Sequence, residues 1–276
     1  GDDETVPAEA ILVAAAKNGF SFERTYSYYV VNDPHVNTTI FNYSLNAARE
    51  AVVTGFKTEN IVPTDDLTAI NIPETIAGYT VTEIGAGAFK SENLESINHQ
   101  IQSVVLPNTI KKIGQSAFAG AKWSDDASNL AGSIKNVKLN EGLEEIGSYA
   151  FSTQSGLSEI SLPESLKKIG NDAFYWTSVN EISIPDSVTS IGSGAFSLCS
   201  NLTYVKLPSG ITKIPSAIFR NSRSIKTFVI PQSITGFDGV SPFTYDITTE
   251  DSFRPSSAMV YLSLIHISEP TRQAEI

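Results

Sequence analysis

The sequence predicts a β-rich solenoid, in which short units stack and each unit adds short parallel strands. One phrase returns at least six times along the chain, and its clearest copy, over residues 157–174, reads LSEISLPESLKKIGNDAF. The Phe residues that close successive copies lie 29, 33, 23, 22 and 23 residues apart. Self-similarity at a nearly fixed period indicates a repeat architecture, because each unit buries its apolar face only against its neighbours.

The unit length and the bulk composition narrow the class of protein. A unit near 23 residues falls within the roughly 20 to 29 residues of a leucine-rich repeat and exceeds a rung of a hexapeptide β-helix. The chain has 276 residues, 41% of them hydrophobic, which suffices for one domain with a buried core. The formal net charge of -11 disfavours nucleic acid as a partner, because phosphate binding needs a clustered basic surface. The longest apolar run, 11–16, is far shorter than the ~20 residues of a membrane span.

Residues 1–19 are expected to form a leader with a short helix. An apolar stretch over 8–16 ends at Lys17, Asn18 and Gly19, a helix C-cap signature. The acidic start after Gly1 is similar to that of mature bacterial surface lipoproteins, which suggests a lipid anchor upstream of Gly1. An arbitrary chain boundary explains the same start equally well.

Residues 20–66 are expected to form a β cap on the open end of the stack. The stretches 41–45 and 51–54 alternate as strands do, and 46–50 connects them, so the sequence predicts a β-hairpin. A cap is needed because a terminal repeat would otherwise expose its apolar edge and unpaired backbone groups to water.

Residues 67–261 carry the repeats, and each unit divides into two short extended segments and a turn. In the first segment Ile160 and Leu162 alternate with Glu159 and Ser161, which predicts one buried and one free face. A Pro such as Pro163 then ends the segment, because Pro has no N–H to give to a ladder. The Ala-Phe pair is expected to place a small residue in the tight turn and a ring in the core.

The Gly near the end of each unit is expected to serve close packing. Pro215 occupies the equivalent position in the last full unit, and Pro fixes φ near about -65°, which argues against a positive φ angle there unless that unit is distorted. The residues before this Gly alternate in charge from unit to unit: Lys111 and Lys112, then Glu144 and Glu145, then Lys167 and Lys168. Because stacked rungs lie about 4.8 Å apart, we expect these charges to pair and to fix the register of the units.

The end of the chain, residues 262–276, is expected to be a non-native tail. Residues 262–272 read LSLIHISEPTR, which resembles a translated adapter used in transposon-based DNA sequencing. On this interpretation the native chain continues past Tyr261 in a further strand, and His266 carries no function. The alternative is a native apolar tail.

The units resemble the BspA-like leucine-rich repeats, whose phrase runs approximately L-xx-I-x-I-P-xx-V-xx-I-G-xx-A-F-xx-C-xx-L. Residues 179–202, VNEISIPDSVTSIGSGAFSLCSNL, match this phrase almost throughout, and 72–89 resemble the customary first unit. The resemblance covers about 67–261 and implies a secreted or surface protein of the kind described as adhesins or interaction modules. It carries over no functional residue, because the motif residues are core residues.

No catalytic or cofactor chemistry is indicated by the sequence. His35 and His99 are 64 residues apart and belong to no HExxH, GxSxG or Cys-His pattern, so we expect no enzyme, no cofactor and no metal site. Asp125, Asp126 and Asn129 lack the alternating oxygen spacing of a calcium loop. The single cysteine, Cys199, stands at the Cys position of the repeat and is expected to be buried.

Candidate partner-binding residues lie on two insertions and on the free face of the first segments. The insertions surround His99 and Trp123, and loops inserted into a solenoid often lie on its binding side. A loop Trp is a plausible contact for a partner, although it can also fold back over the solenoid flank. On the free face, Tyr204 is the only aromatic residue, and Lys206 lies beside it.

We therefore expect a protein-interaction or adhesion module of a secreted or cell-surface bacterial protein. The expected partner is a protein, such as a host extracellular or cell-surface glycoprotein, bound through the solenoid face or its inserted loops. The alternative is a structural spacer that displays another domain. Specific binding of the chain to a surface protein would favour the interaction module, and absence of such binding would favour the spacer.

Overall fold

The computed structural model describes residues 40–57, 60, 69–91, 101–120 and 134–239, together with the backbone of the strand at 259–262. Within these ranges the regular elements are β-strands, and there is no α-helix. The expected leader helix over 1–19, His99, Trp123, Asp125, Asp126, Asn129 and all but the first residue of the expected tail lie outside the described residues.

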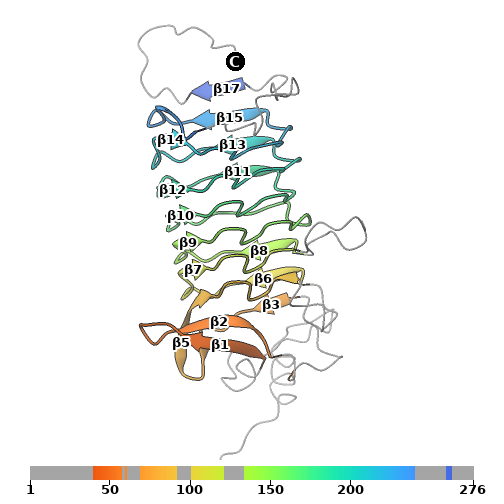
Figure 1. The fold of residues 1–276 in the computed structure, drawn as a ribbon, viewed down its shortest axis with the longest axis vertical. Coiled ribbons are helices and arrows are strands. Elements are labelled where there is room, and N and C mark those ends of the chain that lie inside the picture. Colours follow the sequence, from red (N-terminus) through yellow and green to blue (C-terminus); the bar gives the residue numbers. More distant parts are fainter. Residues whose placement is uncertain are drawn as a thin grey trace, which may run out of the picture. The chain divides into compact units, whose positions relative to one another are not determined.

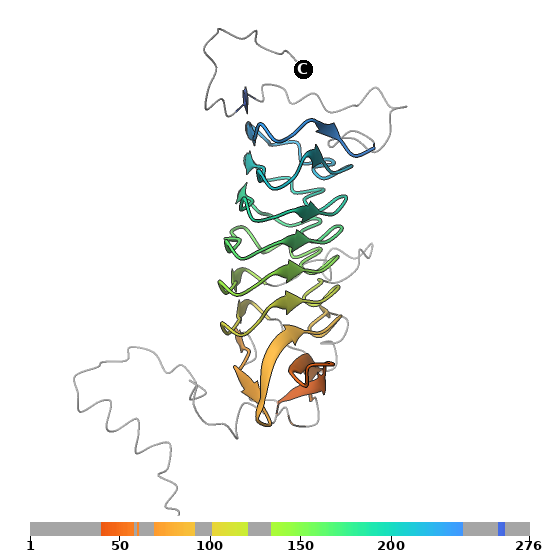
Figure 2. The ribbon, with the colours of Figure 1, turned by 90° about the vertical axis from the view of Figure 1, so that its left-hand side faces the viewer.

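Two rows of short strands run along the stack (Figure 1). The first row precedes the Pro position of each unit and contains β3 (Ala69–Asn71), β6 (Ser103–Val105), β8 (Asn136–Lys138), β11 (Glu181–Ser183), β13 (Tyr204–Lys206), β15 (Thr227–Ile230) and β17 (Met259–Leu262). The second row follows it and contains β5 (Tyr79–Ile84), β7 (Lys112–Ile113), β9 (Glu145–Ile146), β10 (Lys168–Ile169), β12 (Ser190–Ile191), β14 (Lys213–Ile214) and β16 (Gly236–Phe237). Pairing within each row is parallel, as Figure 2 also shows for the successive rungs. The expected β-rich solenoid with short parallel strands is confirmed.

A β-hairpin closes the N-terminal end of the second row. β1 (Phe41–Leu45) pairs antiparallel with β2 (Ala51–Phe56), and β2 pairs parallel with β5. The Asn46 side chain holds the connecting turn, because its Oδ1 accepts the Glu50 N–H at 2.9 Å. A short strand, β4 (Thr75–Ile76), pairs antiparallel with the start of β5. The predicted hairpin is thus confirmed, while most of the expected 20–66 cap lies outside the described residues.

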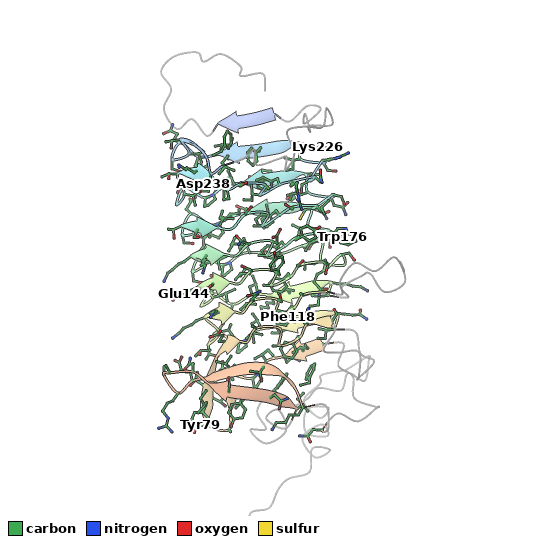
Figure 3. All side chains as sticks on the ribbon, viewed as in Figure 1. Tyr79, Phe118, Glu144, Trp176, Lys226 and Asp238 are labelled. Carbon is green, nitrogen blue, oxygen red and sulfur yellow. The ribbon has the colours of Figure 1, made fainter. Side chains whose placement is uncertain are left out.

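The core is organised around a column of stacked phenylalanine rings. Phe89, Phe118, Phe151, Phe174, Phe196 and Phe219 lie face to face, with neighbouring ring centroids 5.2 to 6.0 Å apart. Each of these rings is almost completely buried, and Figure 3 labels Phe118 among them. Burial of one such side chain stabilises the fold by roughly 1.5–3 kcal/mol, and stacked contacts add to this.

A third line of backbone hydrogen bonds runs along the turns that hold these rings. The N–H of Phe118 donates to the Ala150 carbonyl, and the N–H of Phe151 donates to the Ala173 carbonyl, each at 2.8 Å. The line continues through Phe174 to Ala195 and Phe196 to Ile218. The Ala-Phe turns are therefore joined to each other independently of the two rows of strands.

The glycine of each unit lies against the backbone of the preceding unit, as predicted. A Cβ built on Gly170 would lie 2.3 Å from the Ser148 nitrogen, and one on Gly114 would lie 2.7 Å from the Ala86 nitrogen. The left-handed conformation occurs instead two residues before each Phe, at Gly87, Ser116, Tyr149, Asp172, Gly194 and Ala217. This position was not predicted from the sequence, although Gly87 and Gly194 mark it in two units.

The expected first strand of the 157–174 unit does not form. The alternation of Ile160 and Leu162 with polar residues predicted a strand, but the 159–161 segment joins no sheet, and the first row is divided into β3-β6-β8 and β11-β13-β15-β17. Alternation encodes which side chains face the core. It does not encode the distance to the neighbouring rungs, and the ladder bonds that define a strand depend on that distance.

The second row is divided at a different place, between β12 and β14. In preceding units the Gly N–H donates to the Ile carbonyl of the unit before, as Gly192 does to Ile169 at 2.8 Å. Pro215 has no N–H to offer, so this bond cannot form, and among the described strands β14 pairs only with β16. The strand pairing of the last full unit therefore differs from that of the preceding units. The sequence had left open that Pro215 distorts this unit.

Candidate interaction surface

The first row presents two columns of outward side chains to solvent. Register places Glu181, Tyr204 and Thr227 in one column and Ser183, Lys206 and Val229 in the other. The residues between them, Ile182, Val205 and Phe228, point inward and are buried. The predicted arrangement of the free face is thus confirmed along β11, β13 and β15.

Tyr204 and Lys206 are the two described candidate residues, and both lie on β13. They are half-buried and share the outward face of one strand. The structure therefore brings these two residues together, while the other two candidates, His99 and Trp123, lie outside the described residues.

A hollow of about 320 Å³ lies on the first row around the 159–161 segment. Its lining alternates small polar and apolar side chains: Ser103, Val104, Val105, Asn136, Val137, Lys138, Leu139, Glu159, Ile160 and Ser161. Val105 is 38% exposed here, a large value for an apolar side chain in a strand. This hollow was not predicted from the sequence.

A second hollow of about 370 Å³ lies beyond the ends of β13 and β15. Lys206 lines it together with Asp186 and Ser209, and with Leu207, Val229, Pro231, Gln232 and Ser233. The Ser209 N–H donates to the Asp186 carboxylate at 2.8 Å. This hydrogen bond holds the pKa of Asp186 below its ordinary value, so this wall of the hollow stays negatively charged.

The charges of the second row are paired with one another, in contrast to those of the first row. Lys167 Nζ lies 2.9 Å from Glu144 Oε2, and Lys168 Nζ lies 2.9 Å from Glu145 Oε1. Lys112 bonds Glu83 at the same distance, which extends the predicted column by one unit. The hydrogen bond from Lys167 lowers the pKa of Glu144. The predicted pairing is confirmed between Glu144-Glu145 and Lys167-Lys168, and we assign it to register. Lys112 lies opposite Glu145 in the register, but its ion pair is with Glu83 of the preceding rung.

Cys199 belongs to a buried column of polar side chains that satisfies backbone groups of the turns. Its Sγ lies 3.3 Å from the Phe174 carbonyl, and Ser222 Oγ donates to the Phe196 carbonyl at 2.8 Å. In an earlier unit Gln154 Nε2 donates to the Phe118 carbonyl at 2.7 Å. Burial raises the pKa of the Cys199 thiol to about 11, so the reactive thiolate is suppressed at neutral pH. The expected core role of Cys199 is confirmed.

Metal-holding groups and membrane-spanning helices are both absent from the described residues. Within these ranges, His, Cys, Asp and Glu side chains form no group of three that could hold a metal ion. A search of the same residues for a helix long and apolar enough to cross a bilayer finds none.

The stacked Phe column, the two parallel rows and the Gly turns define a leucine-rich-repeat solenoid. The chain belongs to the BspA type leucine rich repeat family, whose model matches residues 97–126 and 124–246 in six copies, more than half of the chain. Among curated proteins, none matches the chain.

Solved structures of bacterial proteins are similar to this chain. A leucine-rich repeat protein from Bacteroides ovatus is 26% identical over 69% of this chain, with a TM-score of 0.56. The leucine-rich repeat protein of T. pallidum is 29% identical over 68% of this chain and 78% of its own, also with a TM-score of 0.56. The chain spans 46% of the length of the Bacteroides ovatus protein.

Proposed function

We propose that this chain is a protein-interaction or adhesion module of a secreted or cell-surface bacterial protein. It binds a protein, such as a host or neighbouring-cell glycoprotein, through the outward face of the first row. The family and the similarity to bacterial leucine-rich repeat proteins support a binding module rather than an enzyme.

One contrast between the two rows carries this proposal. The second row uses its charged side chains in ion pairs between rungs. On the first row, the described charged residues Lys138, Glu159 and Glu181 are exposed and form no ion pair with described residues. Exposed polar side chains beside apolar ones such as Val105 resemble the mixed surface of non-obligate protein interfaces.

The experiment is a binding screen of the purified chain against immobilised extracellular-matrix and cell-surface glycoproteins at about 150 mM salt. Tyr204→Ala and Ser183→Glu alter the first row. Ser190→Glu is the matched control, because Ser190 is exposed on the second row of the same unit as Ser183. We expect binding that both first-row variants weaken and the control does not.

Other outcomes of the screen point to other conclusions. Binding lost only in a Trp123→Ala variant would move the site to the 120–133 insertion. Absence of binding to every glycoprotein would contradict the interaction module and favour a structural spacer.

A further inference from the structure

The division of the first row leaves backbone groups of the 159–161 segment and of β8 without partners. In β8, Asn136 and Lys138 bond to the preceding rung, since the Asn136 N–H donates to Gln102 and the Lys138 carbonyl accepts from Leu106. Parallel pairing directs the groups of the intervening residue, Val137, toward the next rung. Among the described residues no backbone hydrogen bond joins that rung to β8.

The same rungs are closed on the other side of the solenoid. The Lys167 N–H donates to the Glu144 carbonyl at 2.9 Å, and the Gly170 N–H donates to the Ile146 carbonyl at 2.8 Å. The Phe151 and Phe174 rings stack with centroids 5.5 Å apart. The opening is therefore confined to the first row, where the hollow of about 320 Å³ extends over β6, β8 and the 159–161 segment.

The opening exposes inward side chains that are covered in other units. Val137 and Ile160 are half-buried, whereas the equivalent Val104, Ile182 and Val205 are 0% exposed. Two of the lining residues, Ser103 and Ser161, have short side chains. The hollow thus combines half-buried apolar side chains with amide and carbonyl groups that have no backbone partner among the described residues.

The 159–161 segment is able to form a strand. It alternates like its neighbours and contains neither Pro nor Gly, the residues that most weaken a strand. Unpaired backbone groups on a strand-competent segment are a template for another extended chain, which satisfies them by main-chain hydrogen bonds.

We propose that this opening binds an extended peptide segment of the protein partner. The peptide main chain bonds the free groups of Val137 and of the 159–161 segment, and one apolar side chain rests on Val137 and Ile160. Lys138 and Glu159 line the hollow with opposite charges and form no ion pair with described residues, which favours a peptide carrying an acidic and a basic residue beside the apolar one. This inference rests on the proposed function and names the mode of binding.

The test selects random linear peptides, displayed on phage, against the immobilised chain. Recovered peptides are then synthesised and titrated against the wild type, Ser161→Arg and Thr227→Arg. Ser161 is exposed at the rim of the hollow, and Thr227 lies on β15 of the same row outside it, so the second variant is the matched control. We expect Ser161→Arg to weaken binding at least about tenfold and Thr227→Arg to leave it unchanged. Hydrogen exchange should show bound peptide protecting the amides of Val137 and the 159–161 segment.

Two results would overturn the inference: no enriched peptide, or peptides that bind Ser161→Arg as tightly as the wild type. Native-like circular dichroism of Ser161→Arg is the control for folding, and exchange protection in the wild type tests the site without any substitution. If glycoproteins bind in the screen but no peptide is captured here, the inference fails and the proposed function stands. If peptides are captured here but no glycoprotein binds, the site stands and the proposed partner class fails.

Discussion

At the scale of single residues, the solenoid depends on two backbone positions with different demands. One is the Gly that lies against the preceding unit, such as Gly170. The other is the left-handed residue two positions before the Phe, which includes Asp172 with φ 51 and Tyr149 with φ 58. The first position is limited by space, and the second by the cost of a positive φ in a residue with a Cβ.

Replacing Gly170 with Ala is expected to destabilise the fold strongly. The added Cβ would lie 2.3 Å from the Ser148 nitrogen, a backbone atom that moves only if the rungs separate. Overpacking of this kind costs typically about 1–3 kcal/mol and more where backbone must shift. The matched control is Gly236→Ala, where no atom lies within 4 Å and φ is not positive. Urea titration of both variants checks this, and equal midpoints would contradict the close-packing role.

Asp172→Asn is expected to raise the melting temperature more at pH 7 than near pH 3.5. Burial raises the pKa of Asp172 above its ordinary value, although the Tyr149 hydroxyl and Arg220 oppose this. Because the pKa of Asp172 is higher in the folded state than in the unfolded state, the protonated carboxyl contributes stability at pH values below the unfolded pKa. This contribution is lost as the pH rises through the folded pKa and the carboxyl ionises. Asn can accept the same hydrogen bond from Tyr149 and does not titrate. An equal gain at both pH values would show that the charge of Asp172 is not the cause.

At the scale of elements, much of the arrangement followed from the sequence. The hairpin at 41–56, the outward columns of β11 and β13, and the charge column of the second row were all predicted, because alternation and repeat length together fix which residues become neighbours. Tyr204 and Lys206 were placed correctly on one strand face. The breaks in strand pairing between β8 and β11 and between β12 and β14 were not predicted, because alternation carries no information on the spacing of the rungs. The hollow around Ile160 was not predicted either.

The charge column provides a prediction at this scale. Glu144→Lys with Glu145→Lys places like charges beside Lys167 and Lys168, which now lie 2.9 Å from those carboxylates. We expect the melting temperature to fall by a few degrees at low salt. The difference should shrink near 1 M salt, where the Debye length is about 3 Å. Differential scanning calorimetry at both salt concentrations checks this, and an unchanged melting temperature at low salt would contradict a role in register.

At the scale of the whole molecule, a solenoid is stabilised by the contacts between neighbouring units. Between most described units, both rows and the line of turns contribute backbone hydrogen bonds. Between β12 and β14 the second row contributes none, because of Pro215. Coupling between neighbouring units is therefore not uniform along the stack.

We expect the units after Pro215 to unfold at lower urea than the central units. Fewer backbone bonds join β14 to the preceding rung, so the amides of β14 and β16 should lose protection before those of β9 and β10. Hydrogen exchange measured by mass spectrometry across a urea series checks this. A single midpoint shared by all of these strands would contradict it.

The two divisions also determine how the stack can bend. Where the first row is open, around the 159–161 segment, the second row and the turns still join the rungs. Where the second row is open, at Pro215, β11 and β13 remain paired and the turns remain joined. Because the openings lie on different sides and in different units, we expect the stack to bend more easily at these two places, in different directions, while the remaining bonds keep it continuous. A surface built on this scaffold can adjust its curvature to a partner at one joint while its other units keep their register.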